Sequence, residues 1–257
     1  MIPYPNINPE IVRIGPLAIR WYGLMYLIGF AASLLLVKYQ IKRKNLDFGP
    51  DFVETLYSYL IAGLLLGARA GYVVFYNAEY YIQHPLEIFE IWQGGMSFHG
   101  GFIGVVIAGI IFCKKHRVDF WLLADLVVVT VPIGLGLGRL GNFINGELYG
   151  RVTDAPWAMI FPGESLPRHP SQLYEFFLEG VVLFAILWLV KKRMNPGNVT
   201  ALFLALYGVF RTISEFFREP DAQLGYFFGV ITMGQILSGF MVVSGVILFL
   251  ALNKIRS

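Results

Sequence analysis

The stretch that decides the fold is FWLLADLVVVTVPIGLGL at residues 120–137, which is followed directly by GRLGNFINGELYGR at 138–151. The first segment is apolar over a length that crosses the ~30 Å hydrocarbon core of a bilayer as a helix. The second segment is polar and glycine-rich, with two arginines, two asparagines and a glutamate. This order predicts a membrane-spanning helix that emerges into polar residues at one membrane face.

The composition of the whole chain agrees with a membrane protein. Of 257 residues, 56% are hydrophobic and 14% are charged, which leaves too little polar surface for a soluble globule of this size. The N-terminal sequence MIPYPNINPEIVRIGP has no early basic residue and leads into a long apolar segment, so no removable signal peptide is expected. The single cysteine, Cys113, excludes an intramolecular disulfide and a multi-cysteine metal site.

Seven windows contain the roughly 20 apolar residues that a membrane-spanning helix needs. They lie near 16–37, 52–76, 96–113, 119–138, 171–190, 199–217 and 231–252. We therefore predict an all-α integral membrane protein with one polytopic domain over 1–257 and a bundle of seven transmembrane helices. The aromatic and acidic segment 77–92 predicts a loop and short-helix cap on the outer face, at the level of the lipid headgroups.

Basic residues cluster after alternate predicted spans and at the chain end. The clusters are Lys38, Lys42, Arg43 and Lys44; Lys114, Lys115 and Arg117; Lys191, Lys192 and Arg193; and Lys254 and Arg256. Because positive charge is enriched in cytoplasmic loops, this pattern places the C-terminus in the cytoplasm and the N-terminus outside.

Lysine and arginine are sorted differently across the predicted membrane. All eight lysines fall on the cytoplasmic side, whereas eight arginines lie in outer loops or in the outer halves of spans. These are Arg13, Arg20, Arg69, Arg139, Arg151, Arg168, Arg211 and Arg218. Because a guanidinium group offers a planar fork of donors to a phosphate or carboxylate, the outer half is predicted to hold an anion site.

The window 199–217 carries a polar stripe. Tyr207, Arg211 and Glu215 recur at every fourth position, so they share one helix face. Arg218 returns close to the same direction and extends the stripe to about 16 Å. The stripe should face the bundle interior, because an ionisable group facing lipid costs ~2.5 kcal/mol or more. Glu215 is expected to orient Arg211 or Arg218.

Three residues near the same depth allow two interpretations each. Arg139 either joins the anion site or extends its charge to the membrane surface from a helix end. Arg69 either joins the site or pairs with a backbone carbonyl. His99, at the outer end of the window 96–113, is either a proton-transfer group or the partner in a structural hydrogen bond.

Glycines have two expected roles. The literal GxGxxG at 136–141 is preceded by a membrane span and not by a strand, which excludes a dinucleotide site. Its glycines are expected to let the backbone turn tightly and approach a ligand, with Asn142, Asn145 and Glu147 as partners for nearby arginines. Glycines at 63, 67, 71, 100 and 104 have the spacing that brings membrane helices into close contact. Ser171 is a predicted N-cap for the window that follows it.

These stretches together resemble the bacterial prolipoprotein diacylglyceryl transferases. GRLGNFINGELYGR is similar to the family signature, and other stretches occur in the family's order. They are WYGLMYLIGF at 21, GMSFHGG at 95, RHPSQLYE at 168, YGVFRTISEFFREPDAQLG at 207 and MGQILS at 233. The resemblance covers nearly the whole chain. It departs from the family pattern at Tyr149, a position often held by Trp, and in a shorter stretch 151–168.

The resemblance implies an enzyme of the bacterial cytoplasmic (inner) membrane with its site toward the outer, periplasmic leaflet. Such an enzyme transfers the diacylglyceryl group of phosphatidylglycerol to the lipobox cysteine of a prolipoprotein and releases glycerol phosphate, with no cofactor, metal or nucleic acid. In the family, the arginine matching Arg139 is associated with phosphatidylglycerol binding and the one matching Arg211 with catalysis. Other positions regarded as functional match Tyr22, His99, Asn142, Glu147, Gly150 and Tyr207.

The chemistry that the resemblance implies fits the residues. Arginines aimed at a departing phosphate stabilise the transition state more than the ground state. A cysteine thiol needs either a base, such as His99, or a positive field to become a thiolate near neutral pH. The sequence leaves both routes open.

Other classes of protein fit less well. An anion transporter would place its site near the midplane between repeated halves, and the glycine-rich motif is not repeated. An alcohol phosphatidyltransferase would carry spaced metal-binding aspartates, whereas Asp125 is the only aspartate in the interior of a predicted span. A structural scaffold offers no reason for a polar cluster.

Overall fold

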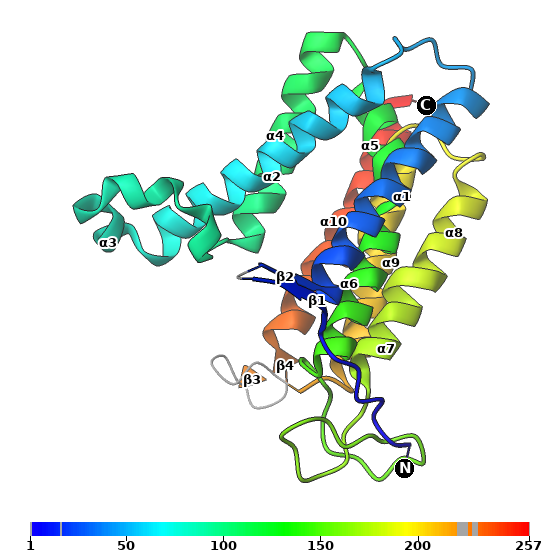
Figure 1. Cartoon of the computed structure of the whole chain (residues 1–257). Coiled ribbons are helices and arrows are strands. Elements are labelled where there is room, and N and C mark those ends of the chain that lie inside the picture. The colour runs from blue at the N-terminus through cyan, green and yellow to red at the C-terminus, as the bar shows by residue number, and fades with distance from the viewer. Residues whose placement is uncertain (1, 16, 220–225, 228–230, 257) are drawn as a thin grey trace. The chain divides into compact units, whose positions relative to one another are not determined.

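The structure, a computed structural model, describes residues 2–15, 17–219, 226–227 and 231–256. The chain divides into two compact units, the first made of Met1–Val37 and Asp125–Ser257 and the second of Lys38–Ala124. Helices dominate both units (Figure 1). Each unit is considered by itself, and one polytopic domain over the whole chain stays a prediction.

Six helical segments in the described part of the chain are long and apolar enough to cross a membrane. They are α1 (Trp21–Arg43), α2 (Phe52–Tyr76), α4 (Phe98–His116), α5 with α6 (Phe120–Val128 and Val131–Asn145), the run of α7, η3 and α8 (Ser171–Glu175, Phe176–Val182 and Leu183–Val190), and α10 (Met233–Arg256). These segments match six of the predicted windows and confirm a multi-pass helical membrane protein.

The remaining predicted window, 199–217, corresponds to the helix α9 (Asn198–Glu215). Arg211 and Glu215 lower its apolar content, and it is not among the six apolar segments. Its passage through the membrane, the total of seven spans and the orientation of the termini therefore stay predictions.

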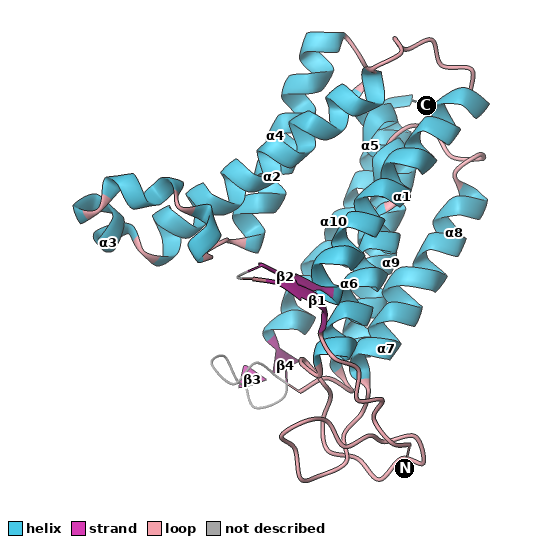
Figure 2. Ribbon diagram, viewed as in Figure 1, coloured by secondary structure: helices cyan, strands magenta, loops and turns pink. Residues whose placement is uncertain are grey.

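Strands in the described residues form two short hairpins (Figure 2). Strand β1 (Glu10–Ile14) pairs antiparallel with β2 (Leu17–Arg20), and β3 (Tyr226–Phe227) pairs with β4 (Ile231–Thr232). The predicted start of the first span at residue 16 is therefore wrong. Residues 17–20 use their backbone groups in a hairpin, and α1 begins at Trp21. The last span likewise begins at Met233, after β4. Residues 220–225, which end the YGVFRTISEFFREPDAQLG stretch, lie outside the described residues.

The first unit is held together by an apolar core and by close helix contacts. One cluster of this core consists of Val129, Leu183, Leu187, Val199 and Phe203. A Cβ atom on Gly136 of α6 would lie 3.1 Å from the Cα atom of Gly180 in η3. A Cβ atom on Gly208 of α9 would lie 2.6 Å from the carbonyl oxygen of Ser238 in α10. Small residues thus let α6 approach η3 and α9 approach α10.

Asp125, near the end of α5, caps the start of α9. Its Oδ1 accepts hydrogen bonds from the backbone N–H of Thr200 at 2.8 Å and from the hydroxyl of Thr200 at 2.7 Å. Its Oδ2 accepts from the N–H of Gly197 at 2.7 Å. The first N–H groups of a helix lack partners within the helix and favour negative charge. The aspartate inside this span is therefore structural.

The second unit is built on the packing of α2 against α4. A Cβ atom on Gly71 would lie 2.8 Å from the Cα atom of Gly100, and a Cβ atom on Gly67 would lie 2.8 Å from the Cα atom of Gly104. The prediction that these glycines pack membrane helices together is confirmed.

The segment after α2 folds as three short helices, α3 (Ala78–Gln83), η1 (Pro85–Phe89) and η2 (Ile91–Gln93). Several of its large apolar side chains are exposed, namely Ile82, Leu86, Phe89 and Trp92. Short helices were expected here. Their position at the lipid headgroups stays a prediction, which the exposed apolar side chains support.

Candidate functional site

Two arginines from different helices of the first unit meet on one glutamate. The Nε atom of Arg139, on α6, lies 2.8 Å from Oε2 of Glu175. The Nη1 atom of Arg211, on α9, donates a hydrogen bond to the same oxygen at 2.6 Å. The side chain of Glu175 is only 1% exposed. Arginines from separate helices therefore converge, as the sequence predicts, on a carboxylate that the sequence analysis did not single out.

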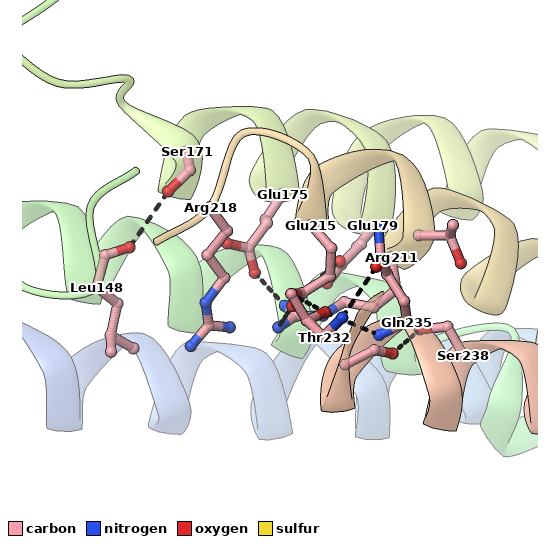
Figure 3. Close-up of polar contacts among 12 residues, drawn as sticks. Leu148, Ser171, Glu175, Glu179, Arg211, Glu215, Arg218, Thr232, Gln235 and Ser238 are labelled. Carbon is pink, nitrogen blue, oxygen red and sulfur yellow. Dashed lines mark hydrogen bonds and ion pairs between the residues drawn. The ribbon is translucent and has the colours of Figure 1, made fainter. Parts of the chain in front are cut away.

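Carboxylates surround Arg211 on further sides (Figure 3). Its Nη2 donates to Oε1 of Glu215, and its Nη1 lies 3.8 Å from Oε1 of Glu179, whose side chain is fully buried. We call Arg139, Glu175, Glu179, Arg211 and Glu215 the arginine–glutamate cluster. Carboxylates of the same unit hold and orient its two guanidinium groups.

Helical spacing places the two new glutamates on one face. Glu175 ends α7, and Glu179 follows four residues later inside η3, which is a stretch of π-helix. A π-helical stretch inside an α-helix often occurs at a functional site. The helix begins at Ser171 with Pro170 as its N-cap, so the predicted capping role of Ser171 is wrong. Its hydroxyl instead donates to the carbonyl of Leu148 at 3.3 Å.

The start of α10 fixes Glu215. The hydroxyl of Thr232 donates to Oε2 of Glu215 at 2.9 Å. The backbone N–H of Thr232 in turn donates to the side chain of Gln235 at 3.0 Å (Figure 3). Gly234 packs on the same carboxylate, since a Cβ atom there would lie 2.5 Å from the carboxyl carbon. Glu215 thus reaches Arg211 from an anchored position, which is the contact expected of an orienting residue.

Two more predicted residues lie on α9 or directly after it. Tyr207 is one turn before Arg211 and stacks on Phe203, with ring centroids 5.8 Å apart. Arg218 follows the end of α9, where burial and the nearby charge of Arg211 lower the pKa of its guanidinium group. Both residues therefore lie beside the cluster along the chain, and their roles stay predictions.

The glycines of the signature stretch pack helices instead of turning the chain. Helix α6 continues to Asn145, so the predicted tight turn at 136–141 is wrong. A Cβ atom on Gly141 would lie 2.8 Å from the ring of Tyr22, whose hydroxyl is 3.1 Å from that of Tyr26. The chain turns at Gly146, where φ is 68°.

Asn142, Asn145 and Glu147 bind one another. Both asparagine amides donate to Oε1 of Glu147 at 2.9 Å. The backbone carbonyl of Glu147 accepts from Gln172 of α7 at 2.8 Å. The expected partnership with arginines is replaced by a hydrogen-bonded turn that joins the end of α6 to the start of α7.

Gly150 lies where a side chain has no room. A Cβ atom there would lie 2.7 Å from the Cβ atom of His169, and the N–H of Gly150 donates to the carbonyl of His169 at 2.8 Å. Next to it, Arg151 donates through Nε to the carbonyl of Arg218 at 2.8 Å. A Cβ atom on Gly150 would also clash with the carbonyl oxygen of Phe217, just after α9, so the absence of a side chain there has a structural cause.

Other outer arginines have partners outside the cluster. Arg13 and Arg20 pair with Glu10 of the exposed hairpin, at 2.5 and 3.6 Å. Arg168 pairs with Glu164 at 2.7 Å and with Glu219 at 3.0 Å. Arg13, Arg20 and Arg168 therefore pair with carboxylates outside the arginine–glutamate cluster.

Arg69, in the second unit, pairs with backbone carbonyls, one of its two predicted outcomes. Its Nε donates to the carbonyl of Ile88 at 2.7 Å. Its Nη1 donates to that of Gly94 at 2.8 Å, and its Nη2 to that of Glu87 at 2.6 Å. The guanidinium carbon lies 5.1 Å from the ring centroid of Tyr81. Arg69 thus ties the segment after α2 to that helix.

His99 also belongs to the second unit, in the first turn of α4. Its side chain is exposed, and its ring meets that of Phe98 edge to face at 5.7 Å. The helix start is capped by Ser97, whose hydroxyl accepts from the N–H of Gly100 at 3.2 Å. The part of His99 in proton transfer stays a prediction.

The sequence analysis missed Glu175 and Glu179, although a signal was present. Both are ionisable residues inside the predicted span 171–190, and such residues are functional candidates by default. Glu175 even ends the quoted stretch RHPSQLYE. The periodic pattern of Tyr207, Arg211 and Glu215 predicts only partners within the same helix. The carboxylate that bridges the two arginines comes from a different helix, α7.

Comparison with known proteins gives one consistent result. Residues 9–251 match the family described as prolipoprotein diacylglyceryl transferase. A protein of Desulfotalea psychrophila named phosphatidylglycerol–prolipoprotein diacylglyceryl transferase is 55% identical over 253 residues, which cover 95% of this chain and 93% of the relative. Proteins with the same name are 53% identical in Geobacter sulfurreducens, with 91% of each chain covered, and 51% identical in Mannheimia succiniciproducens, with 100% and 97% covered.

Proposed function

This chain belongs to the prolipoprotein diacylglyceryl transferase family, and we propose that it transfers the diacylglyceryl group of phosphatidylglycerol to the cysteine thiol of a prolipoprotein lipobox. The reaction is the first step of lipoprotein maturation, and the chain is a transferase. The structural observation that carries the proposal is the meeting of Arg139 and Arg211 on one anionic oxygen.

The arginines act on the phosphate of the lipid. In the transfer, the cysteine sulfur forms a bond to the terminal glyceryl carbon while the bond from that carbon to the phosphate oxygen breaks. The bonding electrons leave with the oxygen, so the phosphodiester becomes glycerol phosphate with one more negative charge. Guanidinium groups aimed at that phosphate stabilise the transition state more than the ground state.

Arg139 is the member of the pair that a lipid reaches first. Its side chain is 20% exposed, compared with 13% for Arg211 and 1% for Glu175. Phosphatidylglycerol binding by Arg139 and catalysis by Arg211 fit this difference. Tyr22, Asn142, Asn145, Glu147 and Gly150 support the substrate side of the site, and Tyr207, Glu215 and Arg218 support Arg211.

The thiol proton must leave for the sulfur to attack. A free cysteine thiol has a pKa of about 8.5 and needs a base or a positive field near neutral pH. His99 is the proposed base, because an imidazole titrates in this range. The alternative is the field of the arginine–glutamate cluster, which would favour the thiolate without any base.

The enzyme is proposed to work in the bacterial cytoplasmic membrane, with seven spans that include α9 and with its site toward the outer leaflet. The charge pattern supports this, because the lysine-rich loops mark the cytoplasmic side and the cluster arginines lie in the outer halves of their spans.

The test is a transfer assay with the purified full-length chain in bilayer discs that contain phosphatidylglycerol. A synthetic lipobox peptide should gain the mass of a diacylglyceryl group, and glycerol phosphate should appear in equal amount. A peptide with serine in place of the cysteine is the control and should stay unmodified. Folded protein that yields neither product would contradict the proposal.

A further inference from the structure

The bridging oxygen of Glu175 stands where two guanidinium groups converge. One acceptor atom meets Arg139 at 2.8 Å and Arg211 at 2.6 Å. Carboxylate and phosphate oxygens are interchangeable partners for such donors, since arginine binds both through charge-assisted hydrogen bonds. A lipid phosphate oxygen that takes the position between the two arginines therefore competes with Glu175 for these two donors.

Glu175 has few ties besides those to the two arginines. Its second oxygen, Oε1, is buried and has no hydrogen-bond partner among the described residues. Glu215, by contrast, is anchored by the hydroxyl of Thr232 at 2.9 Å (Figure 3). The packing of Gly234 also holds it. Glu179 does not bridge the two arginines: its Oε1 atom lies 3.8 Å from Nη1 of Arg211. Exchange of Glu175 for another anion gives up only the two arginine contacts.

We propose that Glu175 is a resident anion of the arginine pair, which the lipid phosphate replaces during binding and which returns to expel glycerol phosphate after transfer. The inference rests on the proposed function. The exchange itself is non-covalent: one anion leaves the two guanidinium groups as another arrives, and no atoms or electrons are transferred.

The negative charge of the released glycerol phosphate explains why such an exchange would help product release. The phosphodiester of the lipid carries one negative charge, whereas the released monoester carries up to two near neutral pH. Two arginines that stabilise the developing charge would therefore hold the product more tightly than the substrate. A carboxylate fixed a few ångströms away competes at a high effective concentration, because it is part of the same chain. Glu175 thus weakens product binding where the arginines strengthen it.

The experiment measures product inhibition in bilayer discs with the lipobox peptide and added glycerol phosphate. In Glu175→Gln, the amide keeps the shape of the side chain but removes the competing charge. The inhibition constant of glycerol phosphate should fall about tenfold, which corresponds to ~1.4 kcal/mol, and kcat should fall while KM for phosphatidylglycerol does not rise. The matched control is Glu215→Gln, which also removes a carboxylate from Arg211 but leaves the bridge intact. Its inhibition constant should change much less.

Two results would overturn the inference while leaving the proposed function in place. A higher inhibition constant in Glu175→Gln would mean that the carboxylate only orients the arginines. Equal changes in Glu175→Gln and Glu215→Gln would mean that total charge matters and not the bridging position. A wild-type protein that transfers no lipid overturns the proposed function, and this inference with it.

A second variant and a wild-type measurement cover the case in which Glu175→Gln does not fold. Glu175→Asp keeps the charge but is one methylene shorter, so it should bridge poorly and lower the inhibition constant in the same direction. In the wild type, infrared difference spectra on adding glycerol phosphate should show a shift of a carboxylate stretching band. A spectrum with bound product and no carboxylate shift would overturn the exchange.

Discussion

Two arginines of this chain, Arg69 and Arg211, are bound by different kinds of partner. Arg69 donates to backbone carbonyls in the second unit, whereas Arg211 in the first unit is surrounded by the carboxylates of Glu175, Glu179 and Glu215. Neither faces lipid without a partner, as the cost of an ionisable group in a membrane requires. The type of partner is what separates a structural arginine from one available for chemistry.

Backbone carbonyls are fixed and neutral. An incoming anion cannot replace them around Arg69 without breaking the fold of the segment after α2. The carboxylates around Arg211 are charged side chains, and at least one of them is tied to little else than the arginines. An arginine balanced by side-chain anions is therefore already oriented for a phosphate and can exchange one anion for another.

The largest effect is expected at the cluster. Arg139→Lys and Arg211→Lys keep the positive charge but lose the planar fork, and each should lower turnover on the order of 10²-fold, by analogy with the loss of one transition-state donor. Turnover is measured by mass spectrometry of the lipobox peptide, and thermal unfolding verifies the fold. Arg13→Lys, in the exposed hairpin, is the control and should transfer lipid normally. Near-normal turnover in both cluster variants would show that charge alone is sufficient.

A smaller effect, and one on stability, is expected for Arg69→Lys. An ammonium group cannot reach the carbonyls of Glu87, Ile88 and Gly94 together, and each partly buried carbonyl left without a donor destabilises the fold. The free energy of unfolding should fall by about 2 kcal/mol or more, measured by denaturation in detergent. Turnover per folded molecule should stay near that of the wild type. A variant that is stable but inactive would remove the contrast between Arg69 and Arg211.

The smallest effect concerns a carboxylate outside the cluster. Hydrogen bonds from Tyr149 and Arg168 lower the pKa of Glu164 in the folded protein. Since the unfolded form binds the proton more readily, the stabilisation is present above the unfolded pKa of about 4.3 and is lost as the pH falls through the lower folded pKa. The difference in melting temperature between wild type and Glu164→Gln should therefore be largest near neutral pH and should shrink in acid. A difference independent of pH would argue against this charge pairing.

The sequence predicts the helical framework well because the membrane imposes a simple rule on it. A span needs a run of apolar residues, so six windows coincide with apolar helical segments, with ends that differ by up to about seven residues. The glycine pairing of α2 with α4 follows from spacing in the same way. The hairpin at residues 10–20 was missed, since its strands are short and Leu17–Arg20 runs on into the apolar start of α1.

The site was harder to predict, because its contacts join residues far apart in the chain. Helical periodicity identifies Tyr207, Arg211 and Glu215 as residues on one face of a helix. The convergence of Arg139 with Arg211 is expected because both lie at a similar depth in the predicted membrane. The bridging position of Glu175 depends on how α6, α7 and α9 pack, which no local pattern contains. The sequence predicts that Asn142, Asn145 and Glu147 bind nearby arginines, because arginines are close in the chain. In the structure a short turn lets both asparagine amides donate hydrogen bonds to Glu147 instead.

The capping of α9 by Asp125 fixes the position from which the rest of that helix extends. Three hydrogen bonds fix its first turn at Gly197 and Thr200. Arg211 lies eleven residues beyond Thr200, or roughly 16 Å along a stiff helix. The capped start of α9 therefore sets how far along the helix, and on which of its faces, the guanidinium group of Arg211 lies. A single inserted residue between the two positions would rotate the guanidinium group by about 100° and shift it by about 1.5 Å, which would take it away from Glu175.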